Sequence, residues 1–194
     1  MANSTIAVTE GSGKNVAGYS FSEDATTKQL QRVVLNDSSG VEAGAWAFDV
    51  AVTPTVTNGA YSAGDIVGAL LTFSSVARAA DELFIITGAQ VMVKAAVTSS
   101  LNLVIFNADP TSTTKTDNAA YSLNAADAFK VVKTIPVSTL YDHGTPNSYS
   151  ADGLFIPTTP VSGSRNIYGL LIDGTGWTLT STGDIQVRLR GVGR

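Results

Sequence analysis

Three short apolar runs lie close together between residues 61 and 107 and dominate the hydrophobic pattern of the chain. Each is rich in β-branched or aromatic residues and is bounded by Gly, Ser, Asn or Asp. Short runs of this composition indicate strands rather than helices. We therefore expect three neighbouring strands feeding one core, over residues 65–73, 82–95 and 99–107, with a bulge or bend at Gly88 in the second.

The flanking regions carry further strand signals separated by turn residues. Residues 48–53 alternate apolar and polar positions with the period of two of a half-buried strand, and Pro54 ends them. Residues 109–118 and 140–153 are polar and predict loops, whereas residues 124–129 predict one helical turn capped by Asn124. Other strands are expected at residues 31–36, 130–137, 154–156, 166–173, 177–180 and 184–190, with hairpin turns at 174–176 and 181–183.

Many short strands without a long amphipathic helix or a fixed-period repeat predict an all-β fold. We expect a β-sandwich of jelly-roll type over residues 46–194, preceded by an extended N-terminal arm over residues 1–45. The arm has too few apolar residues to build a core. Its order is therefore expected to come from a partner's sheet edge or groove.

Composition narrows the class of partner. Only 14% of residues are charged, whereas 44% are hydrophobic, so much of the surface must be Ser, Thr, Asn and Gly. Burying such a surface against a neighbour costs little desolvation free energy, which suits a protein packed against others. An ordinary monomer with a polar, uncharged surface is the alternative interpretation. The net charge of −4 and the 12 dispersed Lys and Arg residues disfavour nucleic-acid binding.

Neither a disulfide framework nor a membrane anchor is expected. The chain contains no cysteine, which fits a reducing cytosol. The first residues lack the basic and apolar regions of a secretory signal, and no apolar run approaches the roughly 20 residues of a membrane span. We expect a soluble protein made in the cytoplasm, with no membrane partner.

No motif predicts an enzyme, a cofactor or a metal. Residues 11–14 (GSGK) lack the spacing and the following Ser or Thr of a phosphate-binding loop. The single histidine, His143, cannot form a triad or a two-histidine metal site, so a hydrogen bond in a loop is expected. The carboxylates are dispersed, which disfavours a glycosidase. A calcium site remains an alternative to Asx turns for four oxygen-bearing residues, Asn107, Asp109, Asp117 and Asn118.

Two sets of residues have alternative interpretations as binding surfaces. Aromatic residues in or near predicted loops either stack on sugars or an interface, or pack at the edge of the core; they are Trp46, Tyr61, Tyr121, Tyr141, Tyr149 and Trp177. Arginines in the last strand form either an interface ridge or a charged, solvated sheet edge; they are Arg188, Arg190 and Arg194.

Several segments beyond residue 60 are distinctive in combination, among them 61–68 (YSAGDIVG), 70–73 (LLTF), 103–110 (LVIFNADP), 116–120 (TDNAA) and 168–171 (YGLL). Through them the chain, from about residue 60 to its C-terminus, resembles a group of tailed-bacteriophage virion structural proteins. The arm is similar less specifically, through residues 31–37 (QRVVLND).

The resemblance implies a non-enzymatic virion component on the capsid surface, assembled in the host cytoplasm. Among virion roles we favour a capsid decoration (cement) protein that binds the major capsid protein and stabilises the head, with self-association as a homotrimer. A head-fibre or tail accessory protein and a host-glycan-binding module are the alternatives. The expected capsid-binding residues lie in the arm and are Tyr19, Phe21, Arg32 and Leu35.

We predict that removing residues 1–44 leaves the domain folded but weakens its attachment to capsids. Ordering the arm costs roughly 1–2 kcal/mol of backbone entropy per residue, so the arm must gain hydrogen bonds and buried side chains on its partner. Circular dichroism would report the fold, and co-sedimentation with emptied capsids would report binding. Binding equal to that of the full chain would contradict the prediction.

Overall fold

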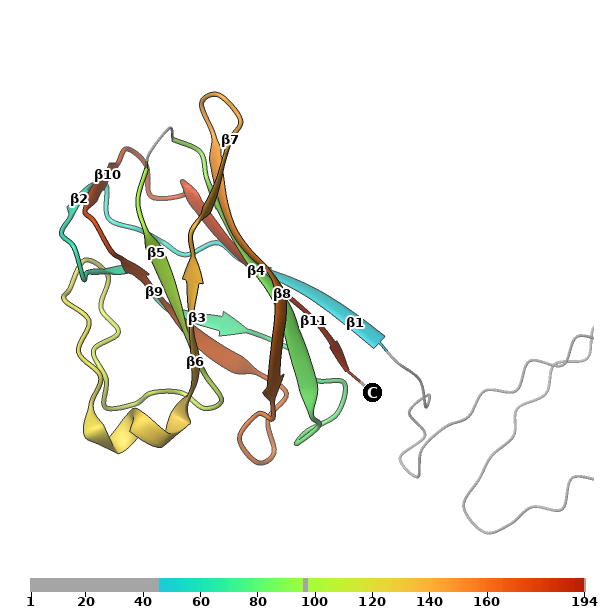
Figure 1. The fold of residues 1–194 in the computed structure, drawn as a ribbon. Helices are drawn as coiled ribbons and strands as arrows, with labels where there is room; N and C mark the ends of the chain where they lie inside the picture. The colour runs from blue at the N-terminus through green and yellow to red at the C-terminus, as the bar shows by residue number, and fades with distance from the viewer. Residues whose placement is uncertain (1–45, 96–97, 194) are drawn as a thin grey trace, which may run out of the picture. The chain divides into compact units, whose positions relative to one another are not determined.

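The computed structural model describes residues 46–95 and 98–193. This part of the chain contains eleven strands and one short 3₁₀ helix (Figure 1). The expected arm and the strand at 31–36 lie outside the described residues. The elements are β1 (Trp46–Val52), β2 (Gly59–Tyr61), β3 (Ile66–Phe73), β4 (Phe84–Val93), β5 (Leu101–Phe106), η1 (Ala125–Lys130), β6 (Val131–Val137), β7 (Thr139–Asp142), β8 (Asn147–Thr158), β9 (Ile167–Asp173), β10 (Trp177–Leu179) and β11 (Ile185–Gly193).

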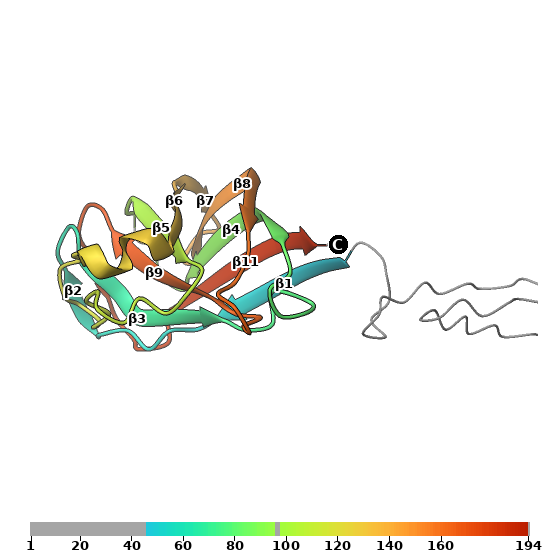
Figure 2. The same ribbon diagram turned by 90° about the horizontal axis from the view of Figure 1, so that it is seen from below.

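All strand pairs are antiparallel, and the strands form two main sheets. The five-stranded sheet has the order β1-β11-β4-β8-β7, and the four-stranded sheet has the order β3-β9-β5-β6; β2 and β10 form a small third sheet. Apart from the consecutive pairs β5–β6 and β7–β8, the neighbours in both sheets are strands far apart in sequence, as in a jelly roll. The expected β-sandwich is confirmed, and Figure 2 shows the two layers from below.

The main core lies between the two sheets and follows from the alternation along each strand. In β5, Leu101, Leu103 and Ile105 point into it, and in β11 alternate positions such as Val187 and Leu189 do the same. Because successive strand residues face opposite sides of the sheet, apolar residues at every second position are enough to bury one whole face. Full burial of such side chains stabilises the fold by about 1.5–3 kcal/mol each.

The four-stranded sheet is also apolar on its outer face. Ile66, Val104, Phe106, Leu170 and Ile172 form a second buried cluster there. The strands that carry them are therefore buried on both faces, which explains why β5 and β9 read as nearly continuous apolar runs. Tyr121, from the segment 107–124 between β5 and η1, packs against this cluster; we call this segment the covering loop.

The three strands expected between residues 61 and 107 form at β3, β4 and β5, but they are not neighbours. β3 and β5 belong to the four-stranded sheet with β9 between them, whereas β4 lies in the five-stranded sheet. They feed one core by facing each other across it. The irregularity expected at Gly88 is present, since the β4–β8 register shifts between Ile86 and Gly88.

The prediction of a long loop at residues 140–153 is wrong. The chain instead forms β7 and the first half of β8, which pair with each other and, through β8, with β4. Ser, Asn and Gly obscure the strand signal, but the long β4 supplies a partner for the backbone of β8. Pro157 does not stop β8, because β7 pairs only as far as Ser150 and proline is tolerated along an unpaired edge.

The hairpins expected at 174–176 and 181–183 are also wrong. β9, β10 and β11 lie in three different sheets, with β10 paired to β2. Both segments are turns in composition, but turn chemistry specifies where a chain can reverse and not which strand it pairs with. The helical turn expected after Asn124 is confirmed as η1, with the Asn124 side chain accepting a hydrogen bond from Ala126 N.

We predict that Gly191→Ala lowers the free energy of unfolding by about 1–3 kcal/mol, the usual cost of overpacking. A Cβ at Gly191 would meet the ring of Phe48 and the carbonyl oxygen of Ile85, and the backbone cannot yield easily there. Gly183→Ala is the matched control, because nothing lies within 4 Å of its added Cβ. Urea unfolding that gave the same midpoint for both variants would contradict the prediction.

Candidate interaction surfaces

The capsid-binding residues expected in the arm, Tyr19, Phe21, Arg32 and Leu35, lie outside the described residues, as do the GSGK segment and Arg194. Their role stays a prediction. Surfaces for interaction must therefore be sought on the domain itself, starting with the covering loop and η1.

Asp117 fixes the covering loop to β2 and β3. Its Oδ2 accepts hydrogen bonds from Thr57 N and Thr57 Oγ1, both at 2.6 Å. Its Oδ1 accepts from the Tyr61 hydroxyl at 2.8 Å and from Gly68 N at 2.6 Å. Burial of Asp117 acts to raise its pKa, but the bonds from Thr57, Gly68 and Tyr61 outweigh burial and lower the pKa.

The same contacts act on Tyr61 in the opposite direction. Burial first, and then its hydrogen bond to the Asp117 carboxylate, raises the pKa of Tyr61. Both groups therefore keep their ordinary charge state across the physiological range. The pair is a structural clamp that holds the loop against the sheet.

Asp127 fixes η1 in a similar way. Its side chain is 1% exposed, and its Oδ2 accepts from Ser112 N, Thr113 N and Thr113 Oγ1 at 2.7–2.9 Å. Its Oδ1 lies 2.8 Å from Lys130 Nζ, which also donates to Asp109 O at 2.8 Å. The Lys130 bond, with those from Ser112 and Thr113, overcomes burial and lowers the pKa of Asp127 to about 2.

The polarity of η1 is inverted. Its two charged side chains, Asp127 and Lys130, are turned toward the covering loop and paired there. The exposed positions of η1 and of the residues before it are largely apolar, with Phe129 100% and Leu123 40% exposed; Ala125, Ala126 and Ala128 are exposed as well. We call Leu123, Ala125, Ala126, Ala128 and Phe129 the apolar knob. A fully exposed aromatic side chain within an apolar patch makes the knob a candidate interaction surface.

The outer face of the five-stranded sheet is polar instead. Arg188 lies 3.1 Å and Arg190 3.9 Å from the same carboxylate oxygen of Asp49, and Arg190 also donates to Gln90 at 3.2 Å. The charged sheet edge considered for these arginines is wrong, because β11 lies between β1 and β4. Exposed pairs of this kind contribute little stability, about 0–1 kcal/mol.

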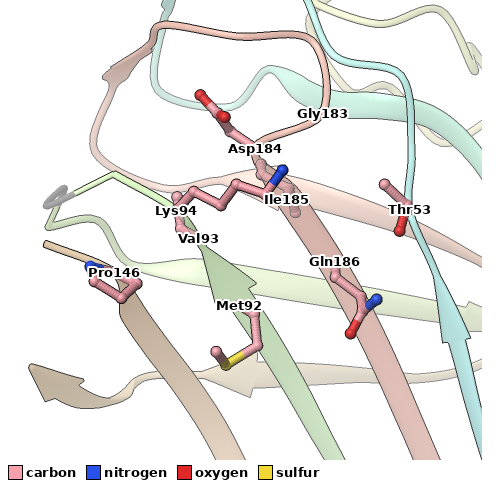
Figure 3. A pocket seen from close by; sticks show the side chains of 9 residues that line it. All are labelled: Thr53, Met92, Val93, Lys94, Pro146, Gly183, Asp184, Ile185 and Gln186. Atoms are coloured by element: carbon pink, nitrogen blue, oxygen red, sulfur yellow. The ribbon is translucent and has the colours of Figure 1, made fainter. Parts of the chain in front are cut away.

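A hollow of about 330 Å³ opens where β4 ends and β11 begins (Figure 3). Thr53, Met92, Lys94, Asp184 and Gln186 are among the residues that line it, with Pro146 from the β7–β8 turn. None of the lining residues is aromatic, so the hollow lacks the stacking platform of a typical sugar site. Its volume is at the lower end of the range for small-molecule sites, about 300–1,000 Å³.

Three of the four oxygen-bearing residues considered for calcium bind protein groups through their side chains. Asp117 accepts the four bonds described above, Asp109 lies 2.8 Å from Lys115 Nζ, and Asn118 donates to Ala60 O. Among residues 46–95 and 98–193, no three His, Cys, Asp or Glu side chains are grouped closely enough to hold a metal. In the same part of the chain, no helix has the length and apolarity needed to cross a membrane.

Three of the six aromatic candidates are explained by packing in the core. Tyr61, Tyr149 and Trp177 are buried, as expected for aromatic residues at the edge of the core, whereas Tyr141 is 52% exposed on β7. His143 lies 2.9 Å from Ser148 Oγ, from Nε2 to oxygen, which confirms the expected loop hydrogen bond within the β7–β8 hairpin.

Sequence reasoning located η1 but missed the apolar knob. The signal was available in part, because Asn124 caps the turn and Asp127 and Lys130 are spaced as an i, i+3 pair. Such a pair usually lies on a solvent-facing surface, however, and nothing in the sequence shows that Thr113 of the covering loop donates hydrogen bonds to Asp127.

We predict that Asp127→Asn destabilises the domain at pH 7 and that the difference from the unsubstituted chain narrows below pH 4. The pKa of Asp127 is lowered from 3.8 to about 2, so its contribution is present above the unfolded value and is lost as pH falls through 2. Thermal unfolding of both chains at pH 7 and at about pH 2 would measure this.

Asp109→Asn is the control for this prediction. Asp109 pairs with Lys115 at the surface, so its replacement should shift the pH 7 midpoint less. A destabilisation by Asp127→Asn that stays constant from pH 7 to pH 2 would show that the ionised carboxylate is not what stabilises η1.

Comparisons with known proteins give distant matches only. No protein-family model and no curated protein matches the chain. Among solved structures, the chain is similar to a chain in the structure of infectious bursal disease virus Gx strain, with a TM-score of 0.34 and 12% identity. The match covers 91% of this chain and 36% of that viral chain. The chain is also similar to the Gt strain, with a TM-score of 0.31 and 14% identity over 90% and 36%. Likeness at this level assigns neither a family nor a function.

Proposed function

We propose that this chain is a non-enzymatic structural protein of a virus particle, and more finely a capsid decoration (cement) protein of a tailed bacteriophage. In this role it binds the outer surface of the major capsid protein lattice and stabilises the head. The sequence resemblance supports the virion role. The observation that carries the proposal on the domain is the apolar knob, with Phe129 fully exposed on a pinned turn.

The knob is suited to docking because its backbone is already ordered. Asp127 and Lys130 hold η1 to the covering loop, so binding need not fix the turn at additional entropic cost. Burying a phenylalanine side chain that was exposed contributes about 1.5–3 kcal/mol. Because the charges of η1 are paired internally, this contact depends on an apolar socket in the partner and only weakly on salt.

One knob is too small to hold a protein on a capsid alone. Stable interfaces bury about 1,200–2,000 Å² in total, whereas an aromatic side chain buries about 150–250 Å². In our proposal the knob is therefore one of several contacts, and the arm supplies others. Repetition of such contacts over a lattice would strengthen the shell by favouring the state that binds best.

We predict that Phe129→Ser weakens binding to emptied capsids at least about tenfold, as expected from losing about 1.5–3 kcal/mol of apolar burial, and leaves stability within about 0.5 kcal/mol. Particles carrying this variant, or lacking the chain, should release their genome at a lower temperature than complete particles. Co-sedimentation and a thermal-release assay would measure the two effects.

Phe155→Ser is the matched control, since Phe155 on β8 is 76% exposed and lies outside the knob. It should bind as the unsubstituted chain does. If particles without the chain release their genome at the same temperature as complete ones, the cement role fails; if only Phe155→Ser weakens binding, the knob is not the contact.

A further inference from the structure

The four edge strands of the two main sheets differ in how they are protected. Among the described residues, these outermost strands are β1 and β7 in one sheet and β3 and β6 in the other. The part of β8 beyond Ser150, which β7 does not reach, is a further short edge that contains Pro157. Unpaired edges invite other strands, and proteins protect them with bulges, prolines, lysines or short length. Three of the four show such protection.

The three protected edges use different devices. β3 is interrupted by a register shift between Val67 and Leu71, where Gly68 and Ala69 have φ of 73° and 39°. β6 contains Lys133 and Pro136, and its register with β5 shifts between Ile105 and Phe106. β7 has only four residues, Thr139–Asp142. None of these offers a long regular ladder.

β1 has none of these protections. Its seven residues, Trp46–Val52, pair with β11 in an unbroken register from Trp46↔Gly193 to Val52↔Val187. The strand contains no proline, lysine or arginine. Its backbone makes no hydrogen bond to another described segment outside the β11 ladder, so among residues 46–95 and 98–193 the donors and acceptors on its other side have no partner. Figure 2 shows β1 at the margin of its sheet.

The side chains of β1 also suit a neighbouring strand. On the outer face, Ala47 and Ala51 are small and exposed, and Asp49 between them is paired with Arg188. The one charge on the strand is therefore directed back over its own sheet. On the inner face, Trp46, Val50 and Val52 are only partly buried, and a further strand would cover them.

We propose that β1 is a self-association edge, which pairs antiparallel with β1 of a second copy about a two-fold axis centred on Asp49. In this register Ala47 lies opposite Ala51 of the second copy, Trp46 lies opposite Val52, and all seven residues of each strand are used. The result is one continuous ten-stranded sheet.

A second copy fits the edge because the strand is complementary to itself. Pairing about Asp49 places inner residues opposite inner residues and outer opposite outer, so both apolar rows stay on the core side. Like charges opposite each other destabilise a sheet, but each Asp49 carries two arginines within 4.0 Å of its carboxylate. A two-fold contact uses the same edge of both copies and leaves neither open.

This inference does not rest on the proposed capsid role, which concerns the apolar knob on the four-stranded side. It predicts assemblies of even number. The homotrimer expected from the resemblance stays a separate prediction, and the mass of the assembly distinguishes the two.

Disulfide trapping tests the register directly, because the chain has no cysteine of its own. Opposed antiparallel residues have Cα atoms about 4.5–5.5 Å apart, within the range of about 4.4–6.8 Å that a disulfide requires. Full-length Ala47→Cys and Ala51→Cys chains would be oxidised separately and as an equimolar mixture. Like positions would be four residues apart along the strands, about 13 Å, and too far to cross-link.

We expect a covalent dimer at twice the 20.1 kDa chain mass in the mixture, and none from either variant alone. Ala126→Cys, exposed in the knob, is the control and should give no specific dimer. Sedimentation of the unsubstituted chain should show a reversible dimer whose population rises with concentration.

Three outcomes would overturn the pairing. The first is a monomer at all concentrations with no cross-linking in the mixture, which would mean that another partner or segment occupies the edge. The second is an assembly of three times the chain mass. The third is cross-linking by Ala47→Cys alone that equals cross-linking in the mixture. Loss of capsid binding by Phe129→Ser with trapping intact would separate the two surfaces, because failure of one leaves the other measurable.

Discussion

The apolar outer face of the four-stranded sheet is the constraint on which the rest of the domain depends. Phe106 and Leu170 are fully buried on that face, and a sheet with two apolar faces needs a cover on each. The five-stranded sheet covers one face, and the covering loop covers the other. The loop is polar at most positions, so it stays in place through hydrogen bonds. The Asp117 and Asp127 carboxylates accept several of them, and the backbone of residues 118–121 bonds to Ile66 and Gly64.

This cover has a consequence for the surface. Once Asp127 and Lys130 are used to pin η1, the side chains left on the solvent side of the turn are apolar, and Phe129 protrudes fully. Stability of the cover and exposure of the knob are thus two results of the same contacts. The five-stranded sheet on the other side of the core has a polar outer face, with Asp49 and its arginines, and among the described residues β1 is its outermost strand.

Most strands could be predicted from the chain because their local pattern and their burial agree. β5 and β9 are apolar on both faces, β1 alternates, and each follows a rule that depends on neighbours in sequence. The first half of β8 was missed because Asn147, Ser148 and Ser150 are polar yet buried, and only the ladder with β4 makes that arrangement favourable. The loop predicted at residues 109–118 forms within the covering loop, but the polar pattern did not show that Thr113 is buried where it meets Asp127.

The fold class, the positions of most strands and the capped turn at η1 can be read from the chain alone, because they depend on composition and on residues close along it. The pairing of the strands, the regularity of the β1 edge and the outward position of Phe129 cannot. These outcomes depend on contacts between residues far apart in sequence, such as Asp117 with Tyr61 or Arg188 with Asp49. These contacts stabilise the chain only once the two sheets have come together, so residues close along the sequence do not reveal them.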